Sequence, residues 1–459
     1  MSTTLFDVQS HTIPCQHIRE YRHATLHDDA VLHLCVKQYR PLNNPKPRPG
    51  DITIIAAHAN GIPKELYEPF WDDLLEQASR NGFRIRGIWI ADVAHQGASG
   101  VLNEDKLGDE PSWHDHTRDL LHMINHFRSA MPSPLIGIGH SMGGAQMYFP
   151  QCSPPSAHPI TILTSRPTFP GQHRTNLSLI HPRLLTSLVL IEPVIDPATT
   201  FPAAPHPAQL SAVRRDLWPT RAAAADAFRK SAFYAAWDER VLRRWIEHGL
   251  RDLPTRLYPT TTSAAGGARA ASDDDHDDAA GPPVTLTTTK AQEVYAFLRV
   301  KSASTSSLDR IVPTTGSAVE ELPFYRPEAP LTHALLPYVV PPTLFVFGAA
   351  SPLSTPPHRH SKLATTSTAT AMGGRGGRTM ERVKGMIVED AGHFVVFERG
   401  KGEEVARGVA AWIGEWVGSG GERGERGDGG RIGVELSEEW LRRLKGWKVG
   451  GGGRTGEKL

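Results

Sequence analysis

Short apolar runs alternate with amphipathic stretches along most of the 459-residue chain. Runs rich in β-branched residues, such as Ile52–Ala57 and Ser187–Ile191, are typical of strands buried on both faces of a parallel sheet. Between such runs, apolar residues recur at helical spacing, for example over residues 64–80. Further strands are expected at 12–22, 31–40, 83–91, 135–138, 343–347 and 383–388. Strands that alternate with helices predict an α/β fold with a mostly parallel, doubly wound sheet.

The region 196–335 departs from this alternation. Helical patterns cover residues 210–218, 222–237 and 240–250, and no strand is expected between them. This predicts a helical cap inserted into the sheet. We expect a first core part (1–195), the cap (196–335), a second core part (336–417) and a tail (418–459) with a Gly/Arg-rich linker and a C-terminal helix.

Two stretches within these parts lack a regular pattern. Residues 147–175 are rich in proline where a helix should continue beyond Gly144, and each proline inside a helix costs about 3 kcal/mol. We interpret them as an irregular insertion, either an intron-derived segment of the gene model or a real surface loop. Residues 262–283 form a low-complexity loop. Its acidic run Asp273–Asp278 predicts a solvated segment and not a metal site, because consecutive carboxylates do not all face one ion.

Composition and charge narrow the class of protein. Lys plus Arg number 50 and Asp plus Glu 49, so no global charge points to nucleic acid. Cys15, Cys35 and Cys152 form neither a disulfide framework nor a metal pattern, which favours a reducing compartment. No apolar run approaches the length of about 18 residues that a membrane span requires, and no secretory signal is recognised. We therefore expect no membrane insertion, no cofactor and no metal.

The motif Gly139-His140-Ser141-Met142-Gly143 follows one of the predicted buried strands and precedes a helix start. A serine hydroxyl is a poor nucleophile, and a tight strand-to-helix turn that lifts Oγ above the sheet helps to activate it. Ser141 is therefore the predicted nucleophile. The Met142 N–H, at the helix start, is the predicted first oxyanion donor. The second is expected in the turn after Ile52–Ala57, where Gly61 permits close approach and Ile62 is the candidate donor.

A base and an acid complete the predicted site. His393 follows the last strand and precedes the last core helix, which is the expected position of the base. The acid usually follows the next-to-last strand, but that strand leads to Ser351 and no carboxylate lies nearby in the sequence. The preceding strand leads to Glu192 and Asp196. Glu192, directly at the strand end, is the predicted acid, and Asp196 remains the alternative.

Several motifs together resemble the fungal α/β-hydrolases typified by AK-toxin biosynthesis hydrolases and the yeast peroxisomal lipase. The motifs are His58-Ala59-Asn60-Gly61-Ile62-Pro63, Gly139-His140-Ser141-Met142-Gly143-Gly144, His181-Pro182-Arg183-Leu184, Leu190-Ile191-Glu192-Pro193, Arg326-Pro327-Glu328-Ala329-Pro330-Leu331 and Ala391-Gly392-His393-Phe394. The resemblance implies the α/β-hydrolase fold. It also implies peroxisomal import through a C-terminal tripeptide, here Glu457-Lys458-Leu459, in which Glu457 replaces the usual small residue.

These features predict a serine hydrolase that cleaves an ester or related acyl bond of an apolar or secondary-metabolite substrate. The small-molecule acyl substrate and a peroxisomal import receptor are the expected partners, and nucleic acid is not expected. Two alternatives remain at this point: a non-catalytic α/β-hydrolase-fold protein, and a chain impaired by the insertion at 147–175. Peroxisomal localisation is predicted, with the cytoplasm as the alternative.

Overall fold

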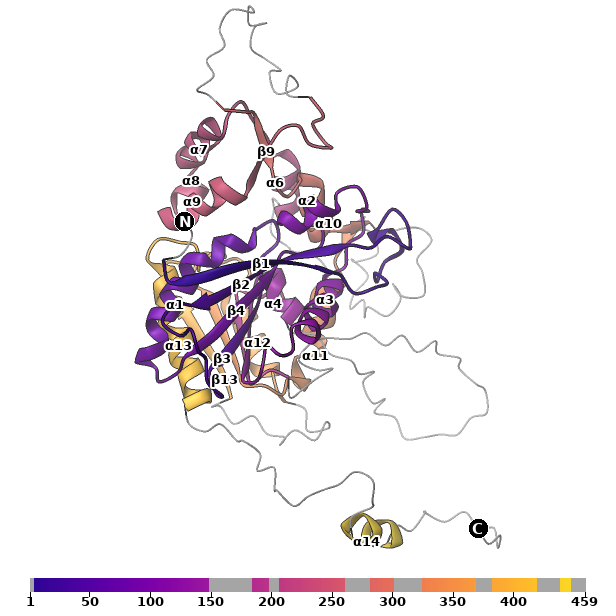
Figure 1. Ribbon diagram of the computed structural model, residues 1–459, viewed down its shortest axis with the longest axis vertical. Helices are drawn as coiled ribbons and strands as arrows, with labels where there is room; N and C mark the ends of the chain where they lie inside the picture. The colour runs from indigo at the N-terminus through magenta and orange to yellow at the C-terminus, as the bar shows by residue number, and fades with distance from the viewer. Residues whose placement is uncertain are drawn as a thin grey trace, which may run out of the picture. The chain divides into compact units, whose positions relative to one another are not determined.

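The computed structural model describes residues 4–147, 184–197, 206–260, 281–300, 324–368, 382–418 and 438–446. Its centre is an eight-stranded sheet of order β1-β2-β4-β3-β5-β6-β12-β13 (Figure 1). The strands are β1 (Phe6–Pro14), β2 (His33–Pro41), β3 (Ile52–Ala57), β4 (Ile85–Ala91), β5 (Leu135–His140), β6 (Ser187–Ile191), β12 (Thr343–Gly348) and β13 (Val383–Val388). β1–β2 and β2–β4 pair antiparallel, and the remaining neighbours are parallel. The predicted mostly parallel α/β sheet is confirmed.

The position predicted for the first strand is wrong. Residues 12–22 were expected to be extended, but β1 ends at Pro14, which pairs with His33 at the start of β2. The Cys15 N–H still donates to the Leu32 carbonyl at 2.8 Å, but Ile18 then has a φ of 64°, which extended backbone does not have, so the strand does not continue to residue 22.

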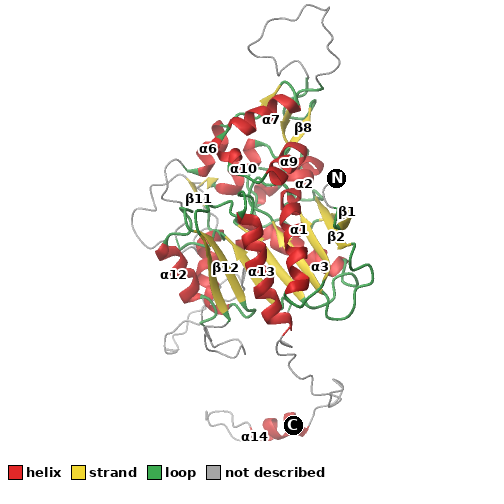
Figure 2. Cartoon of the chain, turned by 90° about the vertical axis from the view of Figure 1, so that its left-hand side faces the viewer, coloured by secondary structure: helices red, strands yellow, loops and turns green. Residues whose placement is uncertain are grey.

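Helices cover both faces of the sheet (Figure 2). They are α1 (Glu68–Arg80), α2 (Gly97–Asn103), α3 (Trp113–His126), α4 (Met142–Met147), α11 (Glu328–Leu335), α12 (Pro356–Thr365) and α13 (Lys401–Gly418), with 3-10 turns η1 (Arg22–Ala24), η2 (Lys64–Tyr67) and η6 (Leu336–Tyr338). Alternate residues of β3 serve the two faces. Ile54 and Ala56 join the core on the side of α1 and α13, and Ile55 and Ala57 join the core on the side of α3 and α4. Burial on both faces explains the continuous apolar runs.

The segment between the two halves of the core carries the helices α6 (Pro207–Val213), α7 (Arg221–Lys230), α8 (Ala232–Ala235), α9 (Glu239–His248) and α10 (Lys290–Phe297). The expectation of helices without strands is wrong here. A small antiparallel sheet of order β7-β9-β8 joins β7 (Leu217–Trp218), β8 (Leu250–Asp252) and β9 (Val284–Leu286), and β10 (Arg299–Val300) pairs with β11 (Phe324–Tyr325). Strands of two or three residues are too short to show an alternating pattern.

The chain divides into two compact units, 1–418 and 419–459. The core and cap residues belong to the first unit. In the second, the structure describes α14 (Glu438–Gly446). Three predicted features lie outside the described residues: the insertion at 147–175 except Met147, the loop 262–283 except 281–283, and the tripeptide 457–459.

Candidate active site

Ser141 lies between the end of β5 and the start of α4. Its φ of 57° falls in the left-handed region that residues other than glycine rarely adopt. The Ser141 N–H donates to the Ile191 carbonyl at 2.9 Å, and its carbonyl accepts from the Val194 N–H at 3.1 Å. The end of β6 therefore holds this strained turn through both backbone groups of the serine.

The two glycines of the motif are required by close packing at this turn. A Cβ on Gly139 would lie 2.4 Å from the Gly143 carbonyl oxygen, and a Cβ on Gly143 would lie 2.3 Å from the Ala57 carbonyl oxygen. Both separations are shorter than real Cβ contacts. Glycine at position 139 lets the turn close on itself, and glycine at position 143 lets the turn approach the end of β3.

His393 lies in the loop after β13, and its Nε2 is 2.8 Å from Ser141 Oγ. The other ring nitrogen, Nδ1, is 3.0 Å from Glu192 Oε2. Because an ionised carboxylate only accepts, Nδ1 carries the proton and Nε2 is free to accept from the Ser141 hydroxyl. The structure thus brings together the three residues predicted as nucleophile, base and acid.

Glu192 directly follows β6, and its side chain is fully buried. Its Oε1 accepts from the Gly348 N–H at 2.7 Å and from Ser354 Oγ at 2.6 Å, and its Oε2 accepts from Ser351 Oγ. Burial alone would raise the pKa of Glu192, but the hydrogen bonds from His393 and the two serines outweigh it and lower that pKa. The carboxylate is therefore held in its ionised form.

The alternative acid, Asp196, does not occupy this position. Its Oδ2 lies 3.4 Å from His358 Nε2. Ser351, which stands where an acid is more usual, instead donates to the acid that has come from β6. Sequence reasoning missed this role of Ser351 and Ser354. The sequence does carry a signal for it. Two hydroxyl residues follow β12 closely, and a carboxylate, Glu192, directly follows the neighbouring strand β6.

The two predicted oxyanion donors come from two neighbouring segments, the elbow at Ser141 and the turn after β3. Met142 begins α4 directly after Ser141. The Ile62 N–H donates to the Ala59 carbonyl at 3.2 Å. Within the same turn the Ala59 N–H donates to Tyr67 Oη at 2.9 Å, and the Gly61 N–H donates to Gln96 Oε1 at 2.8 Å. Ile62 would therefore have to share its N–H between the turn and an oxyanion.

The turn that carries Ile62 is braced by charged side chains. Asp92 is fully buried after β4 and accepts from Lys64 Nζ at 2.6 Å and from the Ala98 N–H at 2.9 Å. From the cap, the Glu293 carbonyl accepts from Asn60 Nδ2 at 3.0 Å. Asp92 thus fixes the loops around the site through its bonds to Lys64 and Ala98.

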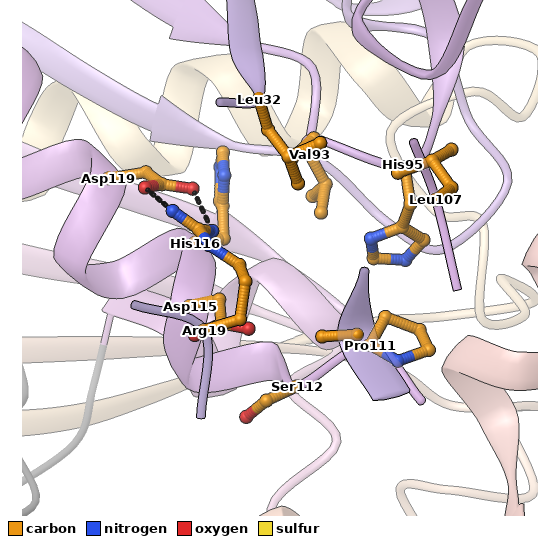
Figure 3. Close-up of a pocket in the computed structure, with 12 residues that line it drawn as sticks. Arg19, Leu32, Val93, His95, Leu107, Pro111, Ser112, Asp115, His116 and Asp119 are labelled. Atoms are coloured by element: carbon orange, nitrogen blue, oxygen red, sulfur yellow. Dashed lines mark hydrogen bonds and ion pairs between the residues drawn. The ribbon is translucent and has the colours of Figure 1, made fainter. Parts of the chain in front are cut away.

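A small cavity lies beside α3 (Figure 3), and none of Ser141, His393 and Glu192 is among the residues that line it. In it, Arg19 donates to both carboxylate oxygens of Asp119, at 2.9 and 2.8 Å. Burial lowers the pKa of both His95 and His116 to about 3, so both rings are neutral. Neither ring nitrogen of His116 has a hydrogen-bond partner among the described residues. Within the same described ranges, no group of three or more His, Cys, Asp or Glu side chains could hold a metal ion.

Known proteins similar to this chain point to one group. The type I acyl-CoA thioesterase mpaH of Penicillium roqueforti is 38% identical over 411 residues, which are 87% of this chain and 86% of that protein. The corresponding thioesterase mpaH' of Penicillium brevicompactum is 38% identical over 425 residues, with 90% and 88% covered. The abhydrolase domain-containing protein ACTT2 of Alternaria alternata is 28% identical over 283 residues, with 62% and 84% covered.

The chain belongs to this fungal α/β-hydrolase family. It is a hydrolase enzyme, and acyl ester hydrolysis is the reaction class of the family.

Among solved structures, the peroxisomal α/β-hydrolase Lpx1 of Saccharomyces cerevisiae aligns with a TM-score of 0.62 and 17% identity over 97% of this chain and 96% of that chain. This likeness confirms the α/β-hydrolase fold. No protein family model matches the chain. None of the described helices is long and apolar enough to cross a membrane.

Proposed function

We propose that the chain hydrolyses an acyl thioester or ester through a catalytic triad of Ser141, His393 and Glu192. The observation that carries the proposal is the continuous series of hydrogen bonds from Ser141 Oγ to His393 Nε2, at 2.8 Å, and from His393 Nδ1 to Glu192, at 3.0 Å. This series has the geometry that a hydroxyl needs to lose its proton as it attacks.

Each step uses a group already in position. Ser141 Oγ attacks the acyl carbon while its proton passes to His393 Nε2, and Glu192 stabilises the resulting imidazolium at Nδ1. The imidazolium then protonates the departing thiolate or alkoxide, which leaves an acyl-serine. A water molecule that loses its proton to the same Nε2 hydrolyses the acyl-serine and releases the acid.

The oxyanion of the tetrahedral intermediate needs two backbone donors, and we assign them to Met142 and Ile62. Support comes from the position of Met142 at the start of α4, where the helix N-terminus favours negative charge. Ile62 belongs to the turn after β3, and Gly143 packs directly against the end of β3, so the turn and the elbow are neighbours. Ile62 would share the N–H that now donates to Ala59.

Aromatic rings beside the base support an apolar acyl group. Phe394 is next to His393, with ring centroids 5.3 Å apart, and Phe233 of α8 packs edge-on against Phe394 at 5.2 Å. Trp237 lies 6.0 Å from Phe394. Phe233 keeps 48% of its surface exposed, so it can still bury area against a substrate. The relatives named acyl-CoA thioesterases support coenzyme A as the leaving group.

A fluorophosphonate probe and a substrate series test the proposal. Wild-type protein should be labelled covalently, and Ser141→Ala should lose both labelling and about 10⁴-fold or more in kcat/KM. Coenzyme A thioesters and matched p-nitrophenyl esters of rising chain length then separate thioesterase from esterase activity. Absence of labelling and of hydrolysis in folded wild-type protein contradicts the proposal.

We also propose import into peroxisomes through Glu457-Lys458-Leu459. The support is this tripeptide alone, in which Lys458 and Leu459 match the pattern of Ser-Lys-Leu. An N-terminally tagged fluorescent fusion should concentrate in peroxisomes of fungal cells and become cytosolic when the tripeptide is deleted. An even cytosolic distribution of the intact fusion contradicts import.

A further inference from the structure

A second chain of hydrogen bonds passes behind the site through the residue that precedes the nucleophile. His140, the last residue of β5, is almost completely buried. Its Nδ1 lies 2.9 Å from Tyr67 Oη, and its Nε2 lies 3.0 Å from the backbone carbonyl oxygen of His393. Tyr67 Oη in turn accepts from the Ala59 N–H at 2.9 Å. Buried polar contacts therefore join the turn after β3, the elbow and the loop of His393.

The partners of this chain permit one arrangement of protons. A carbonyl oxygen only accepts, so the His140 Nε2 carries the hydrogen that meets His393. In the neutral ring Nδ1 must then accept, and the Tyr67 hydroxyl donates to it. The Tyr67 oxygen keeps a lone pair for the Ala59 N–H. Every donor in the chain thus has its acceptor.

The surroundings keep this arrangement. Burial and the nearby His393 lower the pKa of His140 to about 3, and burial raises the pKa of Tyr67 well above its ordinary value. Aromatic rings pack against both members: the Phe397 ring centroid is 5.1 Å from that of Tyr67 and 5.5 Å from that of His140. A fully satisfied polar chain in a dry environment is rigid, because each broken bond would leave a buried polar group unpaired.

We propose that His140 and Tyr67 are positioning residues that hold the backbone of His393 and the oxyanion turn in register with Ser141. The inference rests on the proposed function of the triad. Glu192 orients the imidazole of His393 through its side chain, and His140 fixes the same residue through its main-chain carbonyl. With both ends of His393 held, its Nε2 cannot drift from Ser141 Oγ. The Ala59 N–H anchors the turn that carries the proposed donor Ile62.

Tyr67→Phe tests this role with little change of shape. The variant removes one hydroxyl and leaves both the Ala59 N–H and His140 Nδ1 unpaired. We expect probe labelling of Ser141 and kcat to fall by about 10- to 100-fold, because small misplacements of a base are costly. KM should stay near its wild-type value, since the Tyr67 side chain is buried in the apolar core.

Tyr39→Phe is the matched control. Tyr39 is equally buried on β2 and donates its hydroxyl to Glu68 Oε1 at 3.0 Å, in the same apolar core but without a contact to the elbow. It should lower thermal stability at least as much as Tyr67→Phe and leave kcat unchanged. A loss of kcat in proportion to stability in both variants overturns the inference.

Two variants of His140 provide the second arm. A glutamine amide presents a donor and an acceptor, so His140→Gln should retain most of the labelling rate. His140→Leu should lose it as Tyr67→Phe does, and adding Tyr67→Phe should cause little further loss because the two residues act as a unit. If the wild-type protein reacts with the probe, and Tyr67→Phe, His140→Gln and His140→Leu all react at the wild-type rate, this inference is overturned and the proposed function is not. Wild-type protein that neither reacts nor hydrolyses acyl substrates overturns the proposed function and the inference with it.

Discussion

Ser351 donates a hydrogen bond to the carboxylate of Glu192 from the end of the neighbouring strand. In the sequence, Ser351 stands where the acid of a triad is more usual, and no carboxylate lies nearby. In the structure the same position serves an acid supplied by β6. Together with Ser354 and the Gly348 N–H, it surrounds Glu192 with donors that stabilise the ionised form.

Ser351→Ala should destabilise the protein at neutral pH by about 1.5–3 kcal/mol, the usual contribution of a hydrogen bond to a charged group. These bonds lower the folded-state pKa of Glu192, so their stabilisation is present above the unfolded-state pKa and is lost as pH falls through the folded-state value. Urea unfolding at a series of pH values should therefore show a difference from wild type that shrinks on acidification.

Ser187→Ala is the control for this pH dependence. The Ser187 hydroxyl is also buried, but it donates to the neutral Pro342 carbonyl at 3.2 Å. Its loss should cost a similar amount at every pH. An equal response to pH in the two variants would contradict the assignment of Ser351 to an ionised partner.

Glu192→Gln should reduce kcat by about 10³- to 10⁴-fold, because an amide opposite Nδ1 favours the wrong tautomer of His393. Asp196→Asn should have little effect, since Asp196 pairs with His358 and not with His393. Steady-state kinetics on one thioester decides between them. If Asp196→Asn were the more damaging change, the acid would have been assigned to the wrong residue.

Phe233→Ala should raise KM for long or aromatic acyl groups and leave short acyl groups nearly unaffected. The side chain is 48% exposed, so its removal costs little stability while it takes away contact area beside Phe394. Phe324→Ala on β11, where the side chain is 44% exposed, is the matched control. Equal chain-length profiles for Phe233→Ala and wild type would rule out contact between this ring and the acyl group.

Asp92→Ala should destabilise the fold by about 3–5 kcal/mol, because it leaves the buried ammonium of Lys64 without its closest partner. Lys384→Ala breaks a pair of similar length, 2.8 Å to Glu415, but both side chains are nearly half exposed. That change should cost about 1 kcal/mol or less. Thermal unfolding of the two variants compares the pairs, and similar losses would show that burial does not govern the Asp92–Lys64 contact.

The buried strands and the elbow could be predicted because their signals are local. A strand covered on both faces must be apolar throughout, and Ser141 needs glycines on both sides to turn tightly. The strands of the cap could not be found, since two or three residues carry no periodic signal. Tyr67 also escaped notice as a site residue, because its sequence context is that of an ordinary apolar position in a helix.

The amino-acid sequence by itself determined the class of sheet and the candidates for nucleophile and base, because apolar runs and turn residues act over a few neighbouring positions. It limited the candidates for the acid to Glu192 and Asp196, but it did not show which of the two carboxylates lies beside His393. Only the tertiary structure decided that Glu192 reaches the histidine and that Ser351 supports it. The physical reason is that parallel pairing sets β6 beside β12 and β12 beside β13, so side chains far apart in the sequence meet at one edge of the sheet.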